Sequence, residues 1–230
     1  MKIKEFIQLF VPPIYYKVKK RLFPNKEPKV HPLVMRKNKG ERMIVIGNGP
    51  SLNKSMDLYS DVISASECIM VNYSAITPYF EQIKPAVYVV SDANLLPRVS
   101  DGSSVMKLIH TIALQTSWPM WMVLPSNFRN WWALDILHRN PFITIQFGAA
   151  GWREMPDEQL FPAFDENRVT PPSYTVLTYC LYLAIYWGYP EVYLIGADTS
   201  FPTSVYVGQK DNIVYTVDPH FYENNIQFQM

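Results

Sequence analysis

A short glycine-rich loop is the first feature of this sequence that could do chemistry. The segment from residue 44 to 52 reads IVIGNGPSL, an apolar run followed at once by glycines, an asparagine, a proline and a serine. Glycines let a backbone approach a ligand closely, and the free N–H groups at the start of a helix favour an anion such as a phosphate. The loop therefore predicts a nucleotide-binding turn made of Gly47, Asn48, Gly49, Pro50 and Ser51.

The loop does not match the two best-known phosphate-binding motifs. It is not the dinucleotide fingerprint GxGxxG, because Leu52 stands where the third glycine would be. It is not a Walker loop either, because no GK[ST] follows. A tight glycine turn is also common without any ligand, so the loop alone leaves both interpretations open.

Three further polar residues follow apolar runs at the positions where strands would end. Asn72 follows CIMV, Asp92 follows AVYVVS, and Asp198 follows VYLIGA. The carboxyl ends of parallel strands face one crevice, so these side chains and the glycine loop are expected to line one site. Each of them could instead cap a helix or form a turn.

The elements that must position these residues are visible as short apolar runs without alternation. That pattern is typical of strands covered on both faces. A helix-length apolar stretch also occurs at residues 173–187, SYTVLTYCLYLAIYW, and ends before Gly188, a residue suited to the position after a helix. Strand and helix in alternation predict a parallel Rossmann-like α/β sheet with helices on both faces. The predicted strands are Met43–Ile46, Cys68–Val71, Ala86–Val90, Trp121–Leu124, Ile143–Phe147 and Val192–Ile195.

These motifs resemble those of a known enzyme group. GNGPSL, Asn72, the strand before Asp92, and TVLTYCLYLAIYWGYPEVYLIGAD resemble the bacterial sialyltransferases of glycosyltransferase family 42. They also resemble the wider group of MAF-type flagellin glycosyltransferases and MptE-like pterin pyrophosphokinases. The similarity covers roughly residues 42 to 225 as scattered motifs, and little of it falls between Ala93 and Pro172.

The resemblance implies a metal-independent transferase that takes a sugar from a nucleotide donor such as CMP-sialic acid. It carries the nucleotide-binding role over to the glycine loop and Asn72, and donor contacts to Thr175 and Asp198. Tyr206 corresponds to a tyrosine that donates a hydrogen bond to the departing phosphate. The donor would be a nucleotide-sugar and the acceptor a glycan or a lipid-linked sugar, with no cofactor.

This chain departs from the family pattern at several of these positions. Val176 replaces the serine of a threonine-serine pair, Ser200 replaces the nearer tyrosine, and Asp92 stands where the family has an asparagine. A carboxylate would repel a donor phosphate at close range, so Asp92 is expected to accept from a sugar or ribose hydroxyl. The departures leave the sugar and the base open.

Transfer to a hydroxyl acceptor needs a base, and a histidine suits that work near neutral pH. His31 lies in a linker, and His110 and His138 lie in segments where no other candidate site residue occurs. His220, in VDPHFYENN, lies where the resemblance places a His-Tyr element, and we assign it as the candidate base. A phosphate contact or a plain loop histidine are the alternatives for this residue.

Two other interpretations remain open. An MptE-like diphosphotransferase would need ATP and magnesium, which Asp92 and Asp198 could share. The chain could also be a catalytically inactive, membrane-tethered nucleotide-binding module. Metal-using sugar transferases bind the donor diphosphate through a DxD pair. The sequence contains no DxD pair, so no metal site is predicted.

The amino-terminal segment has a different character from the rest. Residues 1–40 carry a net charge of about +9 and the remainder about −8. Within residues 1–23, apolar side chains recur at helical spacing among lysines and arginines, which favours a basic amphipathic helix. We expect it to lie on an anionic membrane surface, although packing on its own domain is the alternative. Nucleic acid is not an expected partner, because the rest of the chain is acidic.

These patterns together predict an arm and linker over residues 1–40 and one α/β nucleotide-sugar-binding domain over residues 41–230. The protein is expected in the bacterial cytoplasm, peripheral on the inner face of the cell membrane, in surface-polysaccharide synthesis. Cys68 and Cys180 are expected as reduced core residues, the tryptophan-rich runs as core, and the acidic run at residues 154–166 as a solvated loop.

Overall fold

The computed structural model divides the chain into two units, Met1–Val30 and His31–Met230, and everything described below belongs to the second. The expected amphipathic arm, residues 1–23, therefore lies outside the described residues. The structure describes residues 33–36, 40–97, 102–149, 157–171, 175–198, 205–209, 211–217 and 227–229.

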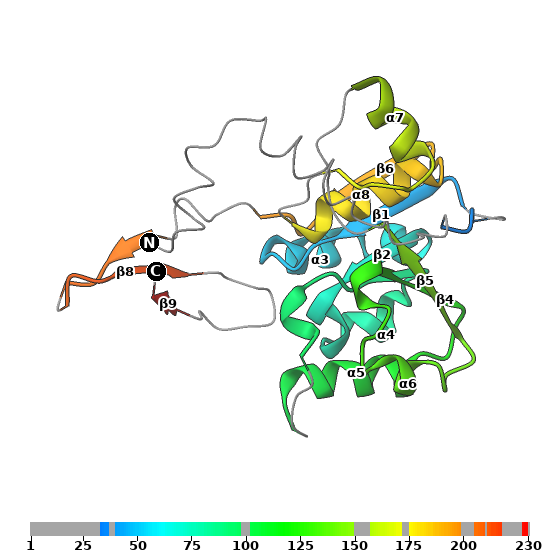
Figure 1. Cartoon of the computed structure of the whole chain (residues 1–230). Coiled ribbons are helices and arrows are strands. Elements are labelled where there is room, and N and C mark those ends of the chain that lie inside the picture. The colour runs from blue at the N-terminus through cyan, green and yellow to red at the C-terminus, as the bar shows by residue number, and fades with distance from the viewer. Residues whose placement is uncertain are drawn as a thin grey trace. The chain divides into compact units, whose positions relative to one another are not determined.

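A six-stranded, fully parallel sheet forms the centre of this unit, as the sequence predicted (Figure 1). The spatial order is β5-β4-β3-β2-β1-β6, so the last strand returns to lie beside the first. Its register against β1 pairs Arg42 with Glu191 and Ile46 with Ile195. The strands are β1 Arg42–Ile46, β2 Glu67–Val71, β3 Val87–Val89, β4 Met120–Pro125, β5 Ile143–Gly148 and β6 Glu191–Ile195.

Helices cover both faces of the sheet, because alternate residues of each buried strand point to opposite sides. In β1, Ile44 and Ile46 pack in one core cluster, whereas Met43 and Val45 pack in the other. The first cluster contains buried side chains of α3 and α5, and the second contains those of α8 (Figure 1). The α-helices are α3 Ser51–Ser64, α4 Tyr79–Ile83, α5 Ser104–Gln115, α6 Leu134–Leu137, α7 Asp157–Asp165 and α8 Val176–Tyr186. None of the described helices is long and apolar enough to cross a membrane.

Helix α8 confirms the apolar segment that the sequence singled out. Tyr179, Cys180 and Leu183 are buried against the sheet. Gly188 follows the helix with φ +69°, a left-handed conformation that glycine adopts without steric cost. The chain then enters β6. Because a helix between two parallel strands runs opposite to them, α8 begins at the same edge of the sheet where the strands end.

A second, antiparallel sheet was not predicted from the sequence. Strand β7 (Val205–Val207) pairs with β8 (Val214–Val217), which pairs with β9 (Gln227–Gln229). Short 3₁₀ helices also follow three strands of the parallel sheet, at Asn72–Ile76, Ala93–Leu95 and Ser126–Phe128.

Two expectations about the chain outside the strands were wrong. Residues 157–165 of the acidic run form helix α7, with Ala163 fully buried, and are not a loop. The expected linker also reaches too far, because Leu33 is 3% exposed and packs in the core cluster beside α8. The folded body therefore begins upstream of the expected boundary at Glu41.

Candidate functional site

The candidate site lies along the carboxyl ends of four neighbouring strands. In spatial order these are β3, β2, β1 and β6, and the loops that follow them carry Asp92, Asn72, Asn48 and Asp198. Strand β1 has β2, the next strand in the chain, on one side and β6, the last strand of this sheet, on the other. The strand order thus reverses between β1 and β6, and such a reversal opens a crevice in parallel sheets. The glycine loop lies at this reversal.

The loops after β1 and β6 are joined by backbone hydrogen bonds. The Gly47 amide donates to the Ile195 carbonyl over 2.8 Å, and the Gly49 amide donates to the Gly196 carbonyl over 2.8 Å. A Cβ atom at Gly47 would lie 2.3 Å from the Gly196 carbonyl oxygen, and Gly196 itself has φ +62°. Glycine is required here because two backbones pass in contact.

Asp198 occupies the start of helix α3. One of its carboxylate oxygens, Oδ2, accepts from the Ser51 amide over 2.9 Å and from the Ser51 hydroxyl over 2.7 Å. A Cβ at Gly49 would lie 2.1 Å from the same oxygen. A carboxylate satisfies an exposed amide of the first turn and interacts favourably with the positive end of the helix dipole. The cap of α3 is therefore supplied by the loop that follows β6.

This contact corrects one expectation about the glycine loop. The amides of Gly47, Gly49 and Ser51 donate to Ile195, Gly196 and Asp198 respectively. They do not form an empty cradle for a phosphate at the start of α3. What the glycines provide is close packing of two strand-end loops. They place Asp198 over the helix terminus, where the sequence interpretation had placed the ligand.

The loops after β1, β2 and β3 are also linked by side chains. The Ser74 hydroxyl lies 2.8 Å from Asn48 Oδ1, and Asn72 Oδ1 accepts from the Ser91 amide over 3.2 Å. Asn72 has φ +44°, a left-handed conformation that asparagine tolerates better than most residues. The Tyr88 hydroxyl accepts from the Ala75 amide over 2.9 Å and helps to hold this turn.

Asp92 serves as a cap, which was one of the two roles left open for it. Its Oδ1 accepts from the Asn94 amide over 2.9 Å, at the start of the 3₁₀ helix after β3. The other carboxylate oxygen has no partner among the described residues.

The four polar side chains therefore share one arrangement. Each uses one atom to hold its own loop or to link it to a neighbouring one, and leaves the other without a partner in the described part of the chain. Asn48 and Asn72 are left with amide nitrogens, which donate, and Asp92 and Asp198 with carboxylate oxygens, which accept. Adjacent strands lie about 4.8 Å apart, so the four strand ends that carry the row span about 14 Å, and in strand order two donors stand between two acceptors.

The length of this row bears on a shared metal ion. Asp92 and Asp198 stand at its two ends, with β2 and β1 between their strands. A magnesium ion holds its oxygen ligands at about 2.1 Å, so the two loops would have to approach each other across the intervening strand ends before their carboxylates could share one. Among the described residues, no group of three or more His, Cys, Asp or Glu side chains has the geometry to hold a metal ion.

The beginning of helix α8 lies beside the glycine loop. Leu177 Cδ1 is 3.1 Å from the position of a Cβ at Gly47. Thr175 is the exposed residue that precedes the helix, and its side chain makes no capping hydrogen bond. The first turn of α8 contains no acidic residue. The terminus of α3 is occupied by Asp198, whereas no described side chain caps that of α8.

The two predicted catalytic residues come from the segment that follows β6. Tyr206 lies on β7 of the antiparallel sheet, with 40% of its surface exposed. His220 lies outside the described residues. Sequence reasoning missed Ser74, Ser91 and Tyr88, which hold the loops through hydrogen bonds. Of these three residues, only Ser74 could have been found from the sequence. It lies three residues after the end of β2, where a serine hydroxyl can form a hydrogen bond with the backbone of the strand end.

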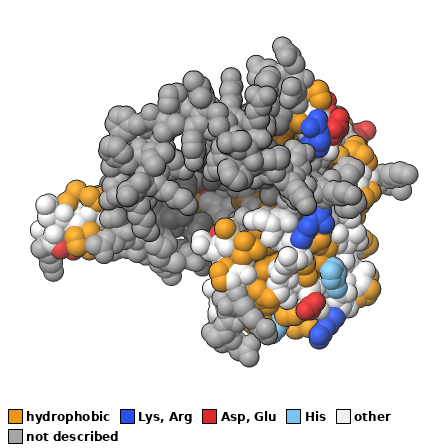
Figure 2. Space-filling view, viewed as in Figure 1, with side chains coloured by type: hydrophobic (Ala, Val, Ile, Leu, Met, Phe, Trp, Pro, Cys, Tyr) orange, Lys and Arg blue, Asp and Glu red, His pale blue; other side chains and the backbone are white. Residues whose placement is uncertain are grey.

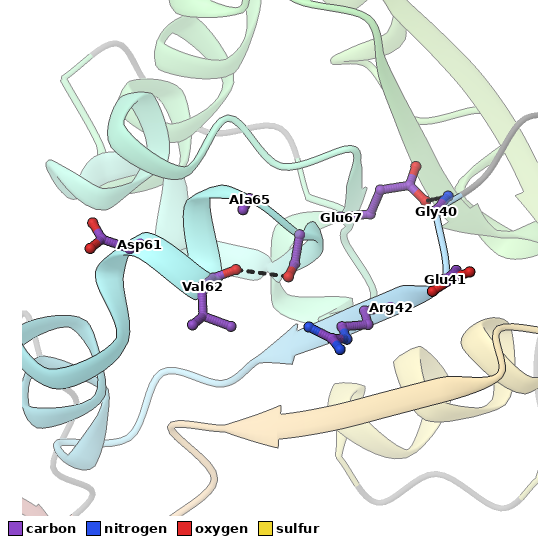
Figure 3. A pocket seen from close by; sticks show the side chains of 8 residues that line it. Gly40, Glu41, Arg42, Asp61, Val62, Ala65 and Glu67 are labelled. Carbon is purple, nitrogen blue, oxygen red and sulfur yellow. Dashed lines mark hydrogen bonds between the residues drawn. The ribbon is translucent and has the colours of Figure 1, made fainter.

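Two surface hollows lie at the opposite, amino-terminal edge of the sheet. One, of about 610 Å³, is lined by residues at the starts of β1 and β2, including Arg42 and Glu67 (Figure 3). The other, of about 700 Å³, precedes β4 and β5 and includes His110 and Arg139. Ligands of open parallel sheets bind outside the carboxyl ends, so neither hollow belongs to the candidate site.

Comparison with known proteins gives one structural similarity. No protein-family model matches the chain, and no curated protein matches it. Among solved structures, a MAf glycosyltransferase from Magnetospirillum magneticum AMB-1 is similar in fold, with a TM-score of 0.49 and 10% sequence identity. The aligned region covers 90% of this chain and 30% of that chain, so this chain spans about 30% of the length of the neighbour.

Proposed function

We propose that this protein is a glycosyltransferase that binds a nucleotide-sugar at the carboxyl edge of its parallel sheet. The observation that carries the proposal is the row Asp92, Asn72, Asn48 and Asp198, in which each side chain is held by one atom and presents the other. A nucleotide-sugar carries ribose hydroxyls on one side of its phosphate oxygens and sugar hydroxyls on the other. Carboxylates accept from hydroxyls, and amide nitrogens donate to phosphate oxygens.

The terminus of helix α8 supports the phosphate part of this proposal. Since Asp198 occupies the start of α3, the phosphate would instead approach the start of α8, near Thr175 and the glycine loop. The two asparagine amides and the helix dipole would stabilise its charge. The transfer would then need no metal, which is the mode that the resemblance to family 42 implies.

The finer assignment rests on the sequence resemblance. We propose CMP-sialic acid or a related sugar as donor and a glycan or lipid-linked sugar as acceptor. The acceptor oxygen would attack the anomeric carbon as its bond to the phosphate oxygen breaks. His220 would take the acceptor proton, and the Tyr206 hydroxyl would donate to the departing phosphate.

The first experiment is a thermal-shift screen with CMP, UDP, GDP, ADP and ATP. A ligand that binds the folded state raises the melting temperature by mass action. One nucleotide is expected to shift the wild-type protein, and the proposal predicts that Asn72→Asp abolishes this shift. The substitution keeps the acceptor for Ser91 and the tolerance of positive φ, but it replaces the donor with a negative charge.

Asn130→Asp is the matched control, because Asn130 is exposed and lies outside the row. It adds the same charge and should leave the nucleotide shift unchanged. A full shift in Asn72→Asp, or its equal loss in the control, would remove the row from the proposed site. A response to ATP alone, abolished by a chelator, would favour the diphosphotransferase instead.

A second prediction concerns His220. His220→Ala should abolish release of CMP from CMP-sialic acid in the presence of an acceptor, while the thermal shift by CMP persists. The reason is that a base acts on the acceptor proton and does not hold the nucleotide. The same assay with EDTA tests metal independence. Undiminished release by the variant would exclude His220 from the mechanism, and absence of release by the wild type would favour a module without catalysis.

A further inference from the structure

Two tyrosines form a fixed aromatic pair on the antiparallel sheet. Tyr206 of β7 lies directly opposite Tyr215 of β8, so both side chains stand on one face. Their ring centroids are 5.6 Å apart and their planes differ by 22°, which is a stacked arrangement. Directly opposed aromatic residues stabilise a strand pair. The pair is therefore a property of the β7–β8 hairpin itself.

The turn between these strands holds Tyr215 in place. Its hydroxyl donates to Asp211 Oδ2 over 2.6 Å, and Asp211 Oδ1 accepts from the Ile213 amide over 3.1 Å. A Cβ at Gly208 would lie 2.3 Å from Asp211 Oδ1 and 2.8 Å from the Tyr215 ring. Because Gly208 has no side chain, the Asp211 carboxylate and the Tyr215 ring can both pack against it, and the carboxylate can accept from the Tyr215 hydroxyl. Both carboxylate oxygens of Asp211 are used within the turn.

Tyr206 is held differently, because its hydroxyl has no hydrogen-bond partner among the described residues. Its ring stacks on Tyr215 and is 40% exposed on β7, an edge strand of this sheet. Hydrophobic side chains gather over this hairpin, with an acidic side chain beside them (Figure 2). The hairpin thus exposes the Tyr206 ring and the Tyr206 hydroxyl, which has no partner among the described residues. Tyr215, held by Asp211, fixes the position of that ring.

We propose that Tyr206 and Tyr215 form a platform that binds a pyranose ring of the acceptor glycan. A pyranose has a face of C–H groups, which an aromatic ring attracts, and hydroxyls around its rim, which can donate to the Tyr206 oxygen while the Tyr206 proton is donated to the departing phosphate. The inference rests on the proposed transferase function and names the acceptor side of it.

Saturation-transfer NMR on the full chain tests the platform with cellobiose as probe. Mannitol is the control ligand, because it has hydroxyls but no ring face. Wild-type protein should transfer magnetisation to the ring protons of cellobiose and not to mannitol. Tyr206→Ala should weaken cellobiose binding about fivefold, in line with one lost aromatic contact of about 1 kcal/mol. Tyr206→Phe should keep most of the stacking.

The matched control is Tyr193→Ala, which removes a tyrosine that is 50% exposed on β6 of the parallel sheet. It should leave cellobiose binding unchanged. Equal binding by wild type and Tyr206→Ala, equal losses in both alanine variants, or binding of cytidine in place of cellobiose would overturn the platform. Circular dichroism of each variant separates lost contacts from unfolding.

Nucleotide thermal shifts on the same samples separate this inference from the proposed function. Cellobiose binding without any nucleotide response would leave the platform standing and contradict the transferase. A specific nucleotide response without cellobiose binding would do the reverse.

Discussion

Single side chains at the amino-terminal edge of the sheet show how this protein keeps a charge in its interior. The Arg36 side chain is only 12% exposed, and its guanidinium lies 2.5 Å from Glu67 Oε1. The same group stands over the rings of Trp121 and Trp187, at 5.3 and 5.8 Å from their centroids. Glu67 Oε2 in turn accepts from the Tyr189 hydroxyl over 2.7 Å. The charge is thus paired with Glu67 and lies beside two aromatic rings.

Replacing Arg36 should therefore be costly. Arg36→Ala is expected to lower the free energy of unfolding by about 3 kcal/mol, because it leaves the partly buried Glu67 carboxylate without its cationic partner. Urea denaturation followed by tryptophan fluorescence measures the change. Arg168→Ala is the control, since its ion pair with Glu166 is exposed and should contribute less than about 1 kcal/mol. Similar losses in both variants would contradict the stabilising role of the Arg36 cluster.

Among the secondary-structure elements, the β7–β8 hairpin has a turn whose hydrogen bonds involve two titratable groups, Asp211 and Tyr215. The Tyr215 hydroxyl holds the pKa of Asp211 below its ordinary value of 3.8, with a contribution from the Ile213 amide. The hydrogen bond to Asp211 raises the pKa of Tyr215 above 10.0. A lowered carboxyl pKa stabilises the folded turn above the unfolded pKa, and this stabilisation is lost as pH falls through the folded pKa. A raised tyrosine pKa acts in the opposite direction at high pH.

The turn should therefore persist from mildly acidic to mildly alkaline pH. We expect the amide resonance of Ile213 to stay constant between about pH 5 and 9 and to shift only below about pH 4, where Asp211 gains a proton. An NMR titration measures this. Asp211→Asn should remove the acidic transition because position 211 no longer titrates. A transition centred near pH 6 in the wild type would show that another group controls the turn.

Across the whole chain, charge is divided between the ends of the sequence. Residues 1–40 carry about +9 and the remainder about −8. We propose that residues 1–23 bind an anionic membrane surface, which fits an acceptor that is lipid-linked and a protein located at the cytoplasmic side of the cell membrane. The proposal rests on the sequence pattern, because these residues lie outside the described structure.

Sedimentation with vesicles tests this arrangement. The full chain should bind vesicles that contain phosphatidylglycerol, because each basic residue near the surface contributes about 1 kcal/mol. Binding should fall steeply in 0.5 M salt, which screens charges beyond about 4 Å. Vesicles of phosphatidylcholine alone and a variant lacking residues 1–23 are the controls. Equal sedimentation of the shortened variant would place the membrane contact elsewhere.

The residue types of the sequence by themselves determined the parallel sheet and helix α8. Strand residues Cys68–Val71 are buried on both faces, and most of the helix at Val176–Tyr186 is buried or partly buried, so both are apolar nearly throughout, and that is visible without a structure. Two elements with exposed side chains gave no such signal. Strand β7 has all three residues exposed, and α7 carries acidic residues and Pro162, so both escaped prediction.

The polar residues of the candidate site could also be found from the sequence, because each follows a buried strand. Only the tertiary structure decided their order along the edge and which atoms remain free. Ser51 and Asp198 are 147 residues apart, and they meet because β6 pairs with β1. That pairing depends on how the whole sheet buries its faces, and no local pattern encodes it. For the same reason, the carboxylate over helix α3 could not be foreseen from the glycine loop.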